Sequence, residues 1–171
     1  MHTDSDLLKL SVRLGHHLLS SAMRISVAES CTAGWVAKCI TDVPGSSQWF
    51  ECGYVTYANA AKNRELGVRN ETLEQQGAVS EATVREMAVG ALFRSGAELS
   101  LALSGIAGPG GATQGKPVGT VWFALSVRRG QAVETVVRVK FFKGDRETVR
   151  RKAVQFALQL ALGTELPSPI Q

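Results

Sequence analysis

Histidine is scarce in this sequence, and its position limits the catalytic chemistry that the chain can use. The three histidines are His2, His16 and His17, so none occurs after residue 17. A serine hydroxyl is a poor nucleophile until a neighbouring base takes its proton. Serine-dependent catalysis in the rest of the chain therefore needs a base other than histidine.

Cysteine and long apolar runs are also scarce. The three cysteines are an odd number, and Cys31, Cys39 and Cys52 form no CxxC pair. This pattern favours neither a disulfide framework nor a zinc site, and it fits reduced thiols in the cytoplasm. The amino-terminal segment is acidic where a secretory signal is basic, and no apolar run approaches the ~18 residues of a membrane span. We therefore expect a cytoplasmic protein without a membrane partner.

The composition is that of one globular domain. The chain has 171 residues and is 44% hydrophobic, which is enough to bury a sizeable core. We expect a single domain at residues 1–165, followed by a loose tail at residues 166–171. The net charge is +4, but the basic residues are scattered along the chain instead of forming a continuous patch. The sequence therefore does not predict binding to nucleic acid.

Strands and helices are predicted to alternate along the chain. Runs rich in apolar, β-branched and aromatic residues predict strands at residues 25–29, 52–58, 99–103, 118–127 and 133–142. Apolar residues at helical spacing predict helices after caps at Asp4 or Ser5, at Ser80 and at Asp145, and two shorter helices at residues 32–41 and 59–66. This order predicts an α/β fold, a single-domain three-layer α/β/α sandwich around a mixed sheet.

Ser30 is the candidate nucleophile. It lies between the first predicted strand and the helix that follows. Free backbone N–H groups of the next turn, among them those of Thr32 and Ala33, can receive an oxyanion at such a place. A serine here is also a common helix cap, and Cys31 is a rival nucleophile, although a buried cysteine is more often a small apolar residue.

Lys62 is the candidate base, in the first turns of the helix that follows the second predicted strand. Partial burial would disfavour its ammonium form and lower its pKa towards neutrality. Without that burial, Lys62 is an ordinary solvated helix residue. Tyr57 precedes the same helix, and its phenol is a candidate to relay or hold a proton between Ser30 and Lys62.

A glycine-rich loop follows the third predicted strand. Residues 110–116 match a P-loop signature, but Pro117 stands where the Ser or Thr that holds magnesium would be. A strand also follows this loop, whereas a helix follows a P-loop. The sequence therefore excludes a P-loop NTPase.

The same loop remains a candidate for anion binding. Gly105 and Gly108 let backbone N–H groups approach an anion, and Ser104 and Thr113 add hydroxyl groups. Arg146 opens the last helix, where it can hold a phosphate in bidentate fashion. Ser30, the stretch at residues 57–62 and the loop at residues 104–113 all follow a predicted strand, so we expect one mouth at the strand ends to collect them.

Seven sequence motifs occur in the same order as in a known protein family. They are Ala-Glu-Ser-Cys-Thr-Ala-Gly at 28–34, Pro-Gly-Ser-Ser at 44–47, Val-Thr-Tyr-Ala-Asn at 55–59 with Lys62, Gly-Ala-Val-Ser at 77–80, Ser-Gly-Ile-Ala-Gly-Pro-Gly-Gly at 104–111, Lys-Pro-Val-Gly-Thr-Val at 116–121 and Gly-Asp-Arg at 144–146. Through these motifs the chain resembles the CinA C-terminal domain family over nearly its whole length. One departure is Ala33, where the family usually has a second glycine.

The resemblance implies an α/β/α fold and an amidohydrolase activity. Free-standing members of the family are nicotinamide-nucleotide amidohydrolases, which convert nicotinamide mononucleotide to nicotinic acid mononucleotide and ammonia in pyridine nucleotide recycling. The family's catalytic serine and lysine fall on Ser30 and Lys62, and its aromatic partner falls on Tyr57. We expect neither a metal nor an organic cofactor, because this dyad can carry a two-step covalent route alone.

The resemblance also implies a ligand and an assembly. The partner is a small-molecule nucleotide with a cationic pyridinium and an anionic phosphate. We expect Glu29 near the ring, and either the loop at residues 104–113 or Arg146 near the phosphate. The resemblance and the apolar last strand lead us to expect a homodimer or a higher homo-oligomer.

Two other functions remain open. A catalytically silent relative can act as a binding module in competence or the DNA-damage response, the context from which the family takes its name. An amidohydrolase can also act on a different small amide with the same dyad. The presence of both Ser30 and Lys62 argues against the silent module, and ammonia release across several pyridine compounds separates all three functions.

Overall fold

A five-stranded mixed sheet organises the chain. The computed structural model describes residues 3–163. Its strands lie in the order β2-β1-β3-β4-β5, and β1 is parallel to β2 and β3, whereas β4 is antiparallel to both β3 and β5. Their bounds are Ile25–Glu29 for β1, Phe50–Val55 for β2, Leu99–Gly105 for β3, Thr120–Arg129 for β4 and Ala132–Phe141 for β5.

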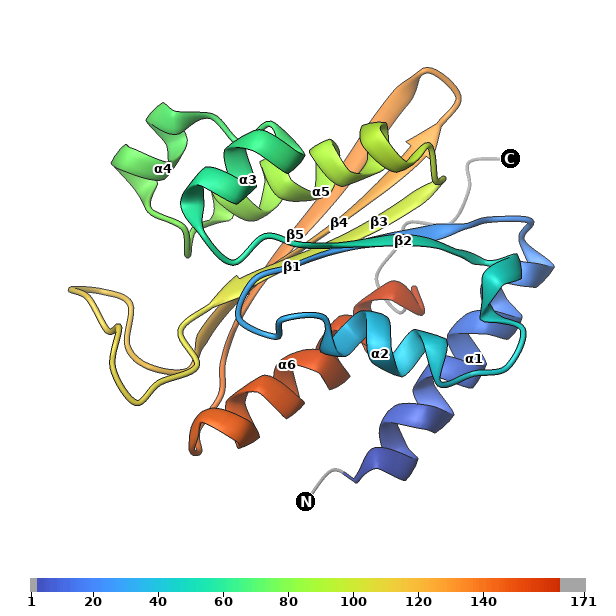
Figure 1. Cartoon of the computed structure of the whole chain (residues 1–171), viewed down its shortest axis with the longest axis horizontal. Coiled ribbons are helices and arrows are strands. Elements are labelled where there is room, and N and C mark those ends of the chain that lie inside the picture. Colours follow the sequence, from blue (N-terminus) through green and yellow to red (C-terminus); the bar gives the residue numbers. More distant parts are fainter. Residues whose placement is uncertain (1–2, 164–171) are drawn as a thin grey trace.

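Helices cover both faces of this sheet (Figure 1). One face carries α1 (Asp4–Ser20), α2 (Trp35–Thr41) and α6 (Arg146–Ala161), and the other carries α3 (Asn59–Leu66), α4 (Asn70–Gln76) and α5 (Glu81–Ser95). A short 3₁₀ helix at Ser46–Gln48 precedes β2. The three-layer α/β/α sandwich with a mixed sheet that the sequence predicted is confirmed.

A separate apolar core lies on each face of the sheet. All five residues of β1 are buried, as expected for a parallel strand that is covered on both sides. Trp49 belongs to the core under α1, where it packs against Gly15. A Cβ atom at Gly15 would lie only 2.9 Å from the Trp49 indole, so the glycine inside α1 makes room for this ring.

Two helices begin at different residues from those predicted. The cap of α1 is Thr3, because the Asp6 N–H donates to Thr3 Oγ1 at 3.3 Å and the Thr3 N–H donates back to the Asp6 carboxylate at 2.9 Å. Helix α2 begins at Trp35 instead of residue 32, because residues 31–34 form a turn. In that turn Ala33 and Gly34 have φ angles of 51° and 92°, which a right-handed helix does not allow.

Other boundaries agree more closely with the sequence pattern. Ser80 and Asp145 cap α5 and α6 as predicted, since their side chains accept from the N–H groups of Thr83 and Thr148. Helix α4 was not predicted, because only two of its residues are buried and it has no apolar stripe. The predicted loose tail lies outside the described residues. No helix within residues 3–163 is long and apolar enough to cross a membrane.

Gly90 lets α3 lie directly against α5. A Cβ atom built on Gly90 would be 1.8 Å from the carbonyl oxygen of Leu66, which ends α3. This distance is far inside van der Waals contact, so only glycine permits the observed packing. The spacing matters because α3 carries Lys62, which is fully buried.

We predict that Gly90→Ala destabilises the fold. In an exposed helix this change stabilises by about 1 kcal/mol, but here the overpacking cost of about 1–3 kcal/mol opposes and exceeds that gain. Urea unfolding measures the difference. Arg94→Ala, an exposed change on the same helix, serves as the control and should shift the free energy of unfolding by no more than about 0.5 kcal/mol. A more stable Gly90→Ala protein would contradict this account of the α3–α5 contact.

Candidate active site

One cavity collects most of the candidate residues at the carboxyl ends of the parallel strands. It has a volume of about 260 Å³. Eight residues singled out in the sequence line it: Ser30, Cys31, Tyr57, Lys62, Ser104, Gly105, Gly108 and Arg146. Ser30 follows β1 directly, and its N–H donates to Leu103 O at 3.1 Å, which extends the β1–β3 pairing to the nucleophile. This hydrogen bond therefore fixes the backbone of Ser30 at the end of β1.

The Lys62 amine contacts the Ser30 hydroxyl directly. Lys62 Nζ lies 3.0 Å from Ser30 Oγ, 2.8 Å from Thr56 O and 3.1 Å from Tyr57 O. The two carbonyls belong to the segment between β2 and α3, which is therefore folded around the amine. Three oxygen atoms thus surround the nitrogen, and Ser30 supplies the only hydroxyl among them.

Burial changes the acid–base behaviour of Lys62. The side chain is 0% exposed, and this loss of solvent lowers the pKa of the amine from 10.5 to about 8. A neutral amine has two N–H donors and one lone pair. When the two carbonyls accept the N–H groups, the lone pair faces the Ser30 hydroxyl and can take its proton. The arrangement fits a general base that acts on a serine.

The neighbouring thiol is a poor rival for Ser30. Cys31 lines the same cavity but is only 5% exposed. Burial and, secondly, the charge of Glu29 raise the pKa of the thiol to about 11. Because the thiolate is the nucleophilic form of cysteine, Cys31 is inert near neutral pH. Ser30 is therefore the nucleophile that this cavity offers.

Glu29 has a different role from the predicted contact with a substrate ring. Its buried carboxylate accepts four hydrogen bonds, from Thr32 Oγ1 at 2.6 Å and from the N–H groups of Gly34, Val36 and Ala37 at 2.8–3.1 Å. The carboxylate thereby accepts from N–H groups at the start of α2 that lack an acceptor within the helix. Gly34, at the N-cap position, has no side chain that could accept from them. Glu29 does not line the cavity, and we assign it to holding the turn after Ser30.

The N–H groups available to an oxyanion differ from those expected. The Ala33 N–H donates to Ser30 O at 3.1 Å, so the predicted donor at Ala33 is already occupied. The N–H groups of Cys31 and Thr32 have no acceptor within residues 3–163. The Thr32 side chain is buried and donates to Glu29. Two N–H groups immediately after Ser30 are therefore free of protein acceptors in the described part of the chain: that of Cys31, which lines the cavity, and that of the next residue, Thr32, which is buried and is not among the lining residues.

Tyr57 and Arg146 form a bridge at the rim of the cavity. Arg146 donates to Gly108 O at 2.8 Å and to the phenol oxygen of Tyr57 at 3.1 Å. The Tyr57 side chain is 58% exposed. Its phenol thus contacts Arg146, while its backbone carbonyl contacts Lys62, and Ser30 and Lys62 are in direct contact without the phenol between them.

Other parts of the site escaped prediction from sequence. Ala78 and Val79, between α4 and α5, also line the cavity, but small apolar residues in a loop carry no recognisable chemical signal. The carbonyl contacts of Lys62 are equally invisible in a sequence, because any residue type has that group. Thr113 lies outside the cavity, and its backbone pairs with Lys116.

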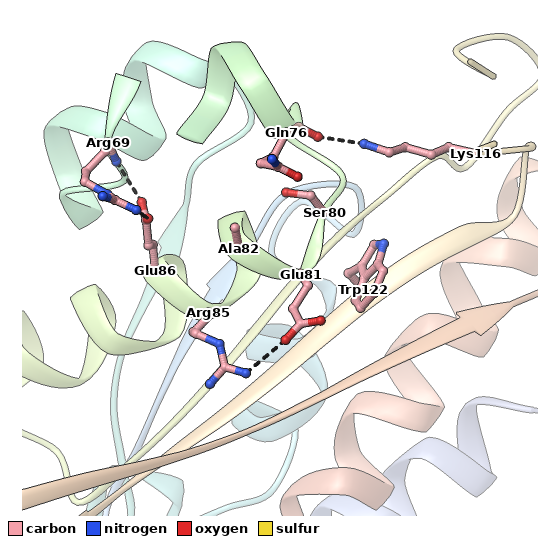
Figure 2. A pocket seen from close by; sticks show the side chains of 9 residues that line it. All are labelled: Arg69, Gln76, Ser80, Glu81, Ala82, Arg85, Glu86, Lys116 and Trp122. Carbon is pink, nitrogen blue, oxygen red and sulfur yellow. Dashed lines mark hydrogen bonds and ion pairs between the residues drawn. The ribbon is translucent and has the colours of Figure 1, made fainter. Parts of the chain in front are cut away.

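A second, larger cavity shares no lining residue with the first. Its volume is about 460 Å³, and Figure 2 shows its lining, which includes Trp122 and several charged side chains. These charges are largely paired with one another, Arg69 with Glu86 at 2.7 Å and Arg85 with Glu81 at 3.0 Å. Neither Ser30 nor Lys62 lines this cavity. The larger cavity therefore lacks both the candidate nucleophile and the candidate base, which line the smaller cavity.

We predict that Glu29→Gln lowers stability. The amide keeps the shape of the carboxylate but replaces one accepting oxygen with a donor, so at least one buried N–H or hydroxyl loses its partner. Loss of a charge-assisted hydrogen bond costs about 1.5–3 kcal/mol, which thermal or urea unfolding resolves. Glu81→Gln, at an exposed glutamate, is the matched control. Unchanged stability in Glu29→Gln would return Glu29 to the predicted role of a substrate contact.

Comparison with known proteins finds relatives over almost the whole chain. The family model for the CinA C-terminal domain matches residues 7–164. The chain is 54% identical over 157 residues to nicotinamide-nucleotide amidohydrolase PncC of Escherichia coli strain K12, covering 92% of this chain and 93% of the relative. It is 50% identical over 158 residues to the PncC of Pseudomonas putida, covering 91% and 96%.

A solved structure is similar to this chain in both fold and sequence. The competence damage-inducible protein A (ComA) of Klebsiella pneumoniae superposes with a TM-score of 0.87 at 39% identity, over 92% of this chain and 96% of that one. The matches in sequence and in structure extend over more than nine-tenths of the chain. The chain therefore belongs to the CinA C-terminal domain family.

Proposed function

We propose that this protein is a nicotinamide-nucleotide amidohydrolase that converts nicotinamide mononucleotide to nicotinic acid mononucleotide and ammonia through a Ser30–Lys62 dyad. The substrate class is supported by the E. coli relative, which bears that activity in its name and matches almost the full length of both chains. The observation that carries the mechanism is the buried Lys62 amine, 3.0 Å from Ser30 Oγ. We further propose a place in NAD recycling.

The first half of the reaction forms an ester on Ser30. Neutral Lys62 takes the proton of the hydroxyl while Oγ attacks the carbon of the carboxamide. The negative charge that develops on the amide oxygen is held by the free N–H groups of Cys31 and Thr32. Lys62, now an ammonium, gives its proton to the departing nitrogen. The C–N bond breaks, ammonia leaves and the nicotinoyl group stays on Ser30.

The second half releases the acid. A water molecule takes the place of ammonia beside Lys62, which is neutral again and removes a proton from it. The resulting hydroxide attacks the ester carbon, and the same N–H groups hold the second oxyanion. Lys62 returns the proton to Ser30 Oγ as the ester bond breaks. The dyad regains its starting state, and no step requires a metal or an organic cofactor.

The anionic end of the substrate fits the rim formed by Arg146 and the glycine-rich loop. Arg146 keeps its guanidinium at the mouth of the cavity, where it is fixed by Gly108 O and by the Tyr57 phenol. A guanidinium presents a planar set of donors that matches phosphate. Gly110 and Gly111 also line the cavity, and with no Cβ they allow a phosphate to approach the backbone closely. We therefore place the phosphate at this rim.

A catalytically silent binding module explains the same geometry less well. Burying the amine of Lys62 without a carboxylate among its three contacts is costly, and it serves no purpose in a protein that only binds. Perturbed titratable groups in a cavity are typical of catalytic sites. We also propose that the enzyme is cytoplasmic, with which the three free cysteines agree. We propose a homodimeric assembly as well.

The dyad predicts a complete dependence of ammonia release on both side chains. Ser30→Ala and Lys62→Met should each lower kcat on nicotinamide mononucleotide by at least about 10³-fold, because they remove the nucleophile and its base. Ser47→Ala and Lys38→Met, at exposed positions, are the matched controls and should keep full activity. Assays on nicotinamide, its riboside, its mononucleotide and NAD define the preferred substrate. Ammonia release that survives in either dyad variant would contradict the mechanism.

The lowered pKa of Lys62 predicts two pH profiles. The value of kcat/KM should rise about tenfold per pH unit below pH 8 and level off above it, as the amine loses its proton. Between pH 8 and 10.5 the unfolded chain binds a proton at Lys62 that the folded protein does not. The contribution of Lys62 to the free energy of unfolding therefore increases with pH across this window, by up to about 1.4 kcal/mol per pH unit.

Lys62→Met provides the comparison for both profiles. The variant should lack the increase in stability between pH 8 and 10.5 that Lys62 gives to the wild type. The difference between the two unfolding curves isolates the lysine from all other titrating groups. A kcat/KM that stays flat between pH 6 and 9 would show that a group other than Lys62 takes the proton.

A further inference from the structure

We propose that Arg150 is a positioning residue that fixes the turn after Ser30 and strengthens the backbone donors of the oxyanion site. The inference rests on the proposed amidohydrolase mechanism and assigns a role to a residue outside the cavity. Arg146, one helical turn earlier in α6, lines the cavity, whereas Arg150 does not. Arg146 and Arg150 therefore act on different parts of the site.

Arg150 holds two successive carbonyls of the nucleophile turn. Its Nε donates to Cys31 O at 3.0 Å, and its terminal NH2 group donates to Thr32 O at 2.9 Å. A planar guanidinium makes both contacts at once and so fixes the two peptide groups relative to each other. This clamp comes from α6, far along the chain from the turn that follows Ser30.

The clamp bears directly on one free oxyanion donor. The Cys31 carbonyl and the Thr32 N–H belong to the same planar peptide group and point in opposite directions. A charged donor on the carbonyl side therefore aims this N–H away from Arg150 and polarises it, which makes it a stronger hydrogen-bond donor.

The second free donor is supported in a similar way. The Cys31 N–H shares its peptide group with Ser30 O, which accepts from the Ala33 N–H. Both donors that have no acceptor among residues 3–163 thus belong to peptide groups whose carbonyls are occupied. Arg150 also holds Thr32 O, which joins this part of the turn to Ala33.

The charge of Arg150 is directed at these carbonyls. No carboxylate of residues 3–163 pairs with it, whereas Arg151, the next residue, pairs with Asp4 and with Glu147. Both guanidinium groups lie over the ring of Trp35, at 5.3 Å for Arg150 and 5.0 Å for Arg151. Arg151 is thus a natural comparison, with the same helix, the same ring and the same charge but no contact with the turn.

The turn needs an external contact of this kind. Residues 31–34 precede the first regular turn of α2, and Ala33 has a φ of 51°, which residues with a side chain rarely adopt. Glu29 holds the end of the turn that leads into α2, and Arg150 holds the end next to Ser30. Without Arg150, the peptide group that carries the free Thr32 N–H loses the contact that restrains its orientation, and only the Ala33 N–H still restrains the peptide group that carries the Cys31 N–H.

The test compares three variants on nicotinamide mononucleotide. Arg150→Gln should lower kcat by about 10- to 100-fold, less than the 10²–10³-fold caused by removal of a direct oxyanion donor. The KM and the pH midpoint of kcat/KM should stay at the wild-type values, because substrate binding and Lys62 are untouched. Arg150→Lys should recover part of kcat, and Arg151→Gln should keep it. Added methylguanidinium should raise kcat in Arg150→Gln alone.

Each other outcome decides against the proposal. A raised KM with unchanged kcat in Arg150→Gln would make Arg150 a substrate contact. A lower kcat that follows a lower melting temperature, with no recovery by lysine or methylguanidinium, would make its role purely structural. Wild-type activity in both Arg150 variants would overturn this inference alone. An inactive wild type would instead remove the proposed function, and this inference with it.

Discussion

The contact between the Lys62 amine and the Ser30 hydroxyl is the interaction on which the site depends, and much of the local structure is arranged to bury it. Lys62 lies on α3, whose close approach to α5 is possible because residue 90 is glycine. Ser30 lies at the end of β1, on the sheet itself. The chain between β2 and α3 supplies the two carbonyls that accept from the amine. Ser30 and Lys62 are therefore brought together by the packing of a helix layer against the carboxyl end of β1, and not by a local sequence motif.

Burial of this amine is destabilising, and the size of that free-energy cost explains why three oxygen atoms contact the nitrogen. Lowering the pKa of Lys62 from 10.5 to about 8 corresponds to about 3 kcal/mol of preference for the neutral form. That is a large fraction of the 5–15 kcal/mol by which a domain is typically stable. The three oxygen contacts satisfy the buried nitrogen, so that its polar group is not left unpaired. A lysine can then do the work for which the chain has no nearby histidine.

The sequence predicts the sandwich, and it places the dyad residues at the ends of the correct elements, because strand and helix periodicity and caps such as Ser80 and Asp145 are local signals. What it does not predict depends on contacts between distant segments. Glu29 precedes a serine and looks available to a ligand, yet four donors from the following turn occupy it. Tyr57 reaches Lys62 through its carbonyl, and its phenol binds an arginine from the last helix. Backbone groups and side-chain directions carry no residue-type signature, so these features appear only in three dimensions.

The two helix layers contribute different chemistry to the single edge where they meet. The layer with α3 and α5 supplies the base, and the layer with α2 and α6 supplies the cations and the turn that follows the nucleophile. Ser30 lies between them because β1 is the strand whose end both layers can reach. The three hydrogen-bonding contacts of Lys62 accordingly include neither Arg146 nor Arg150. In the proposed mechanism, the base and the turn that bears the oxyanion donors therefore come from opposite faces of the sheet (Figure 1).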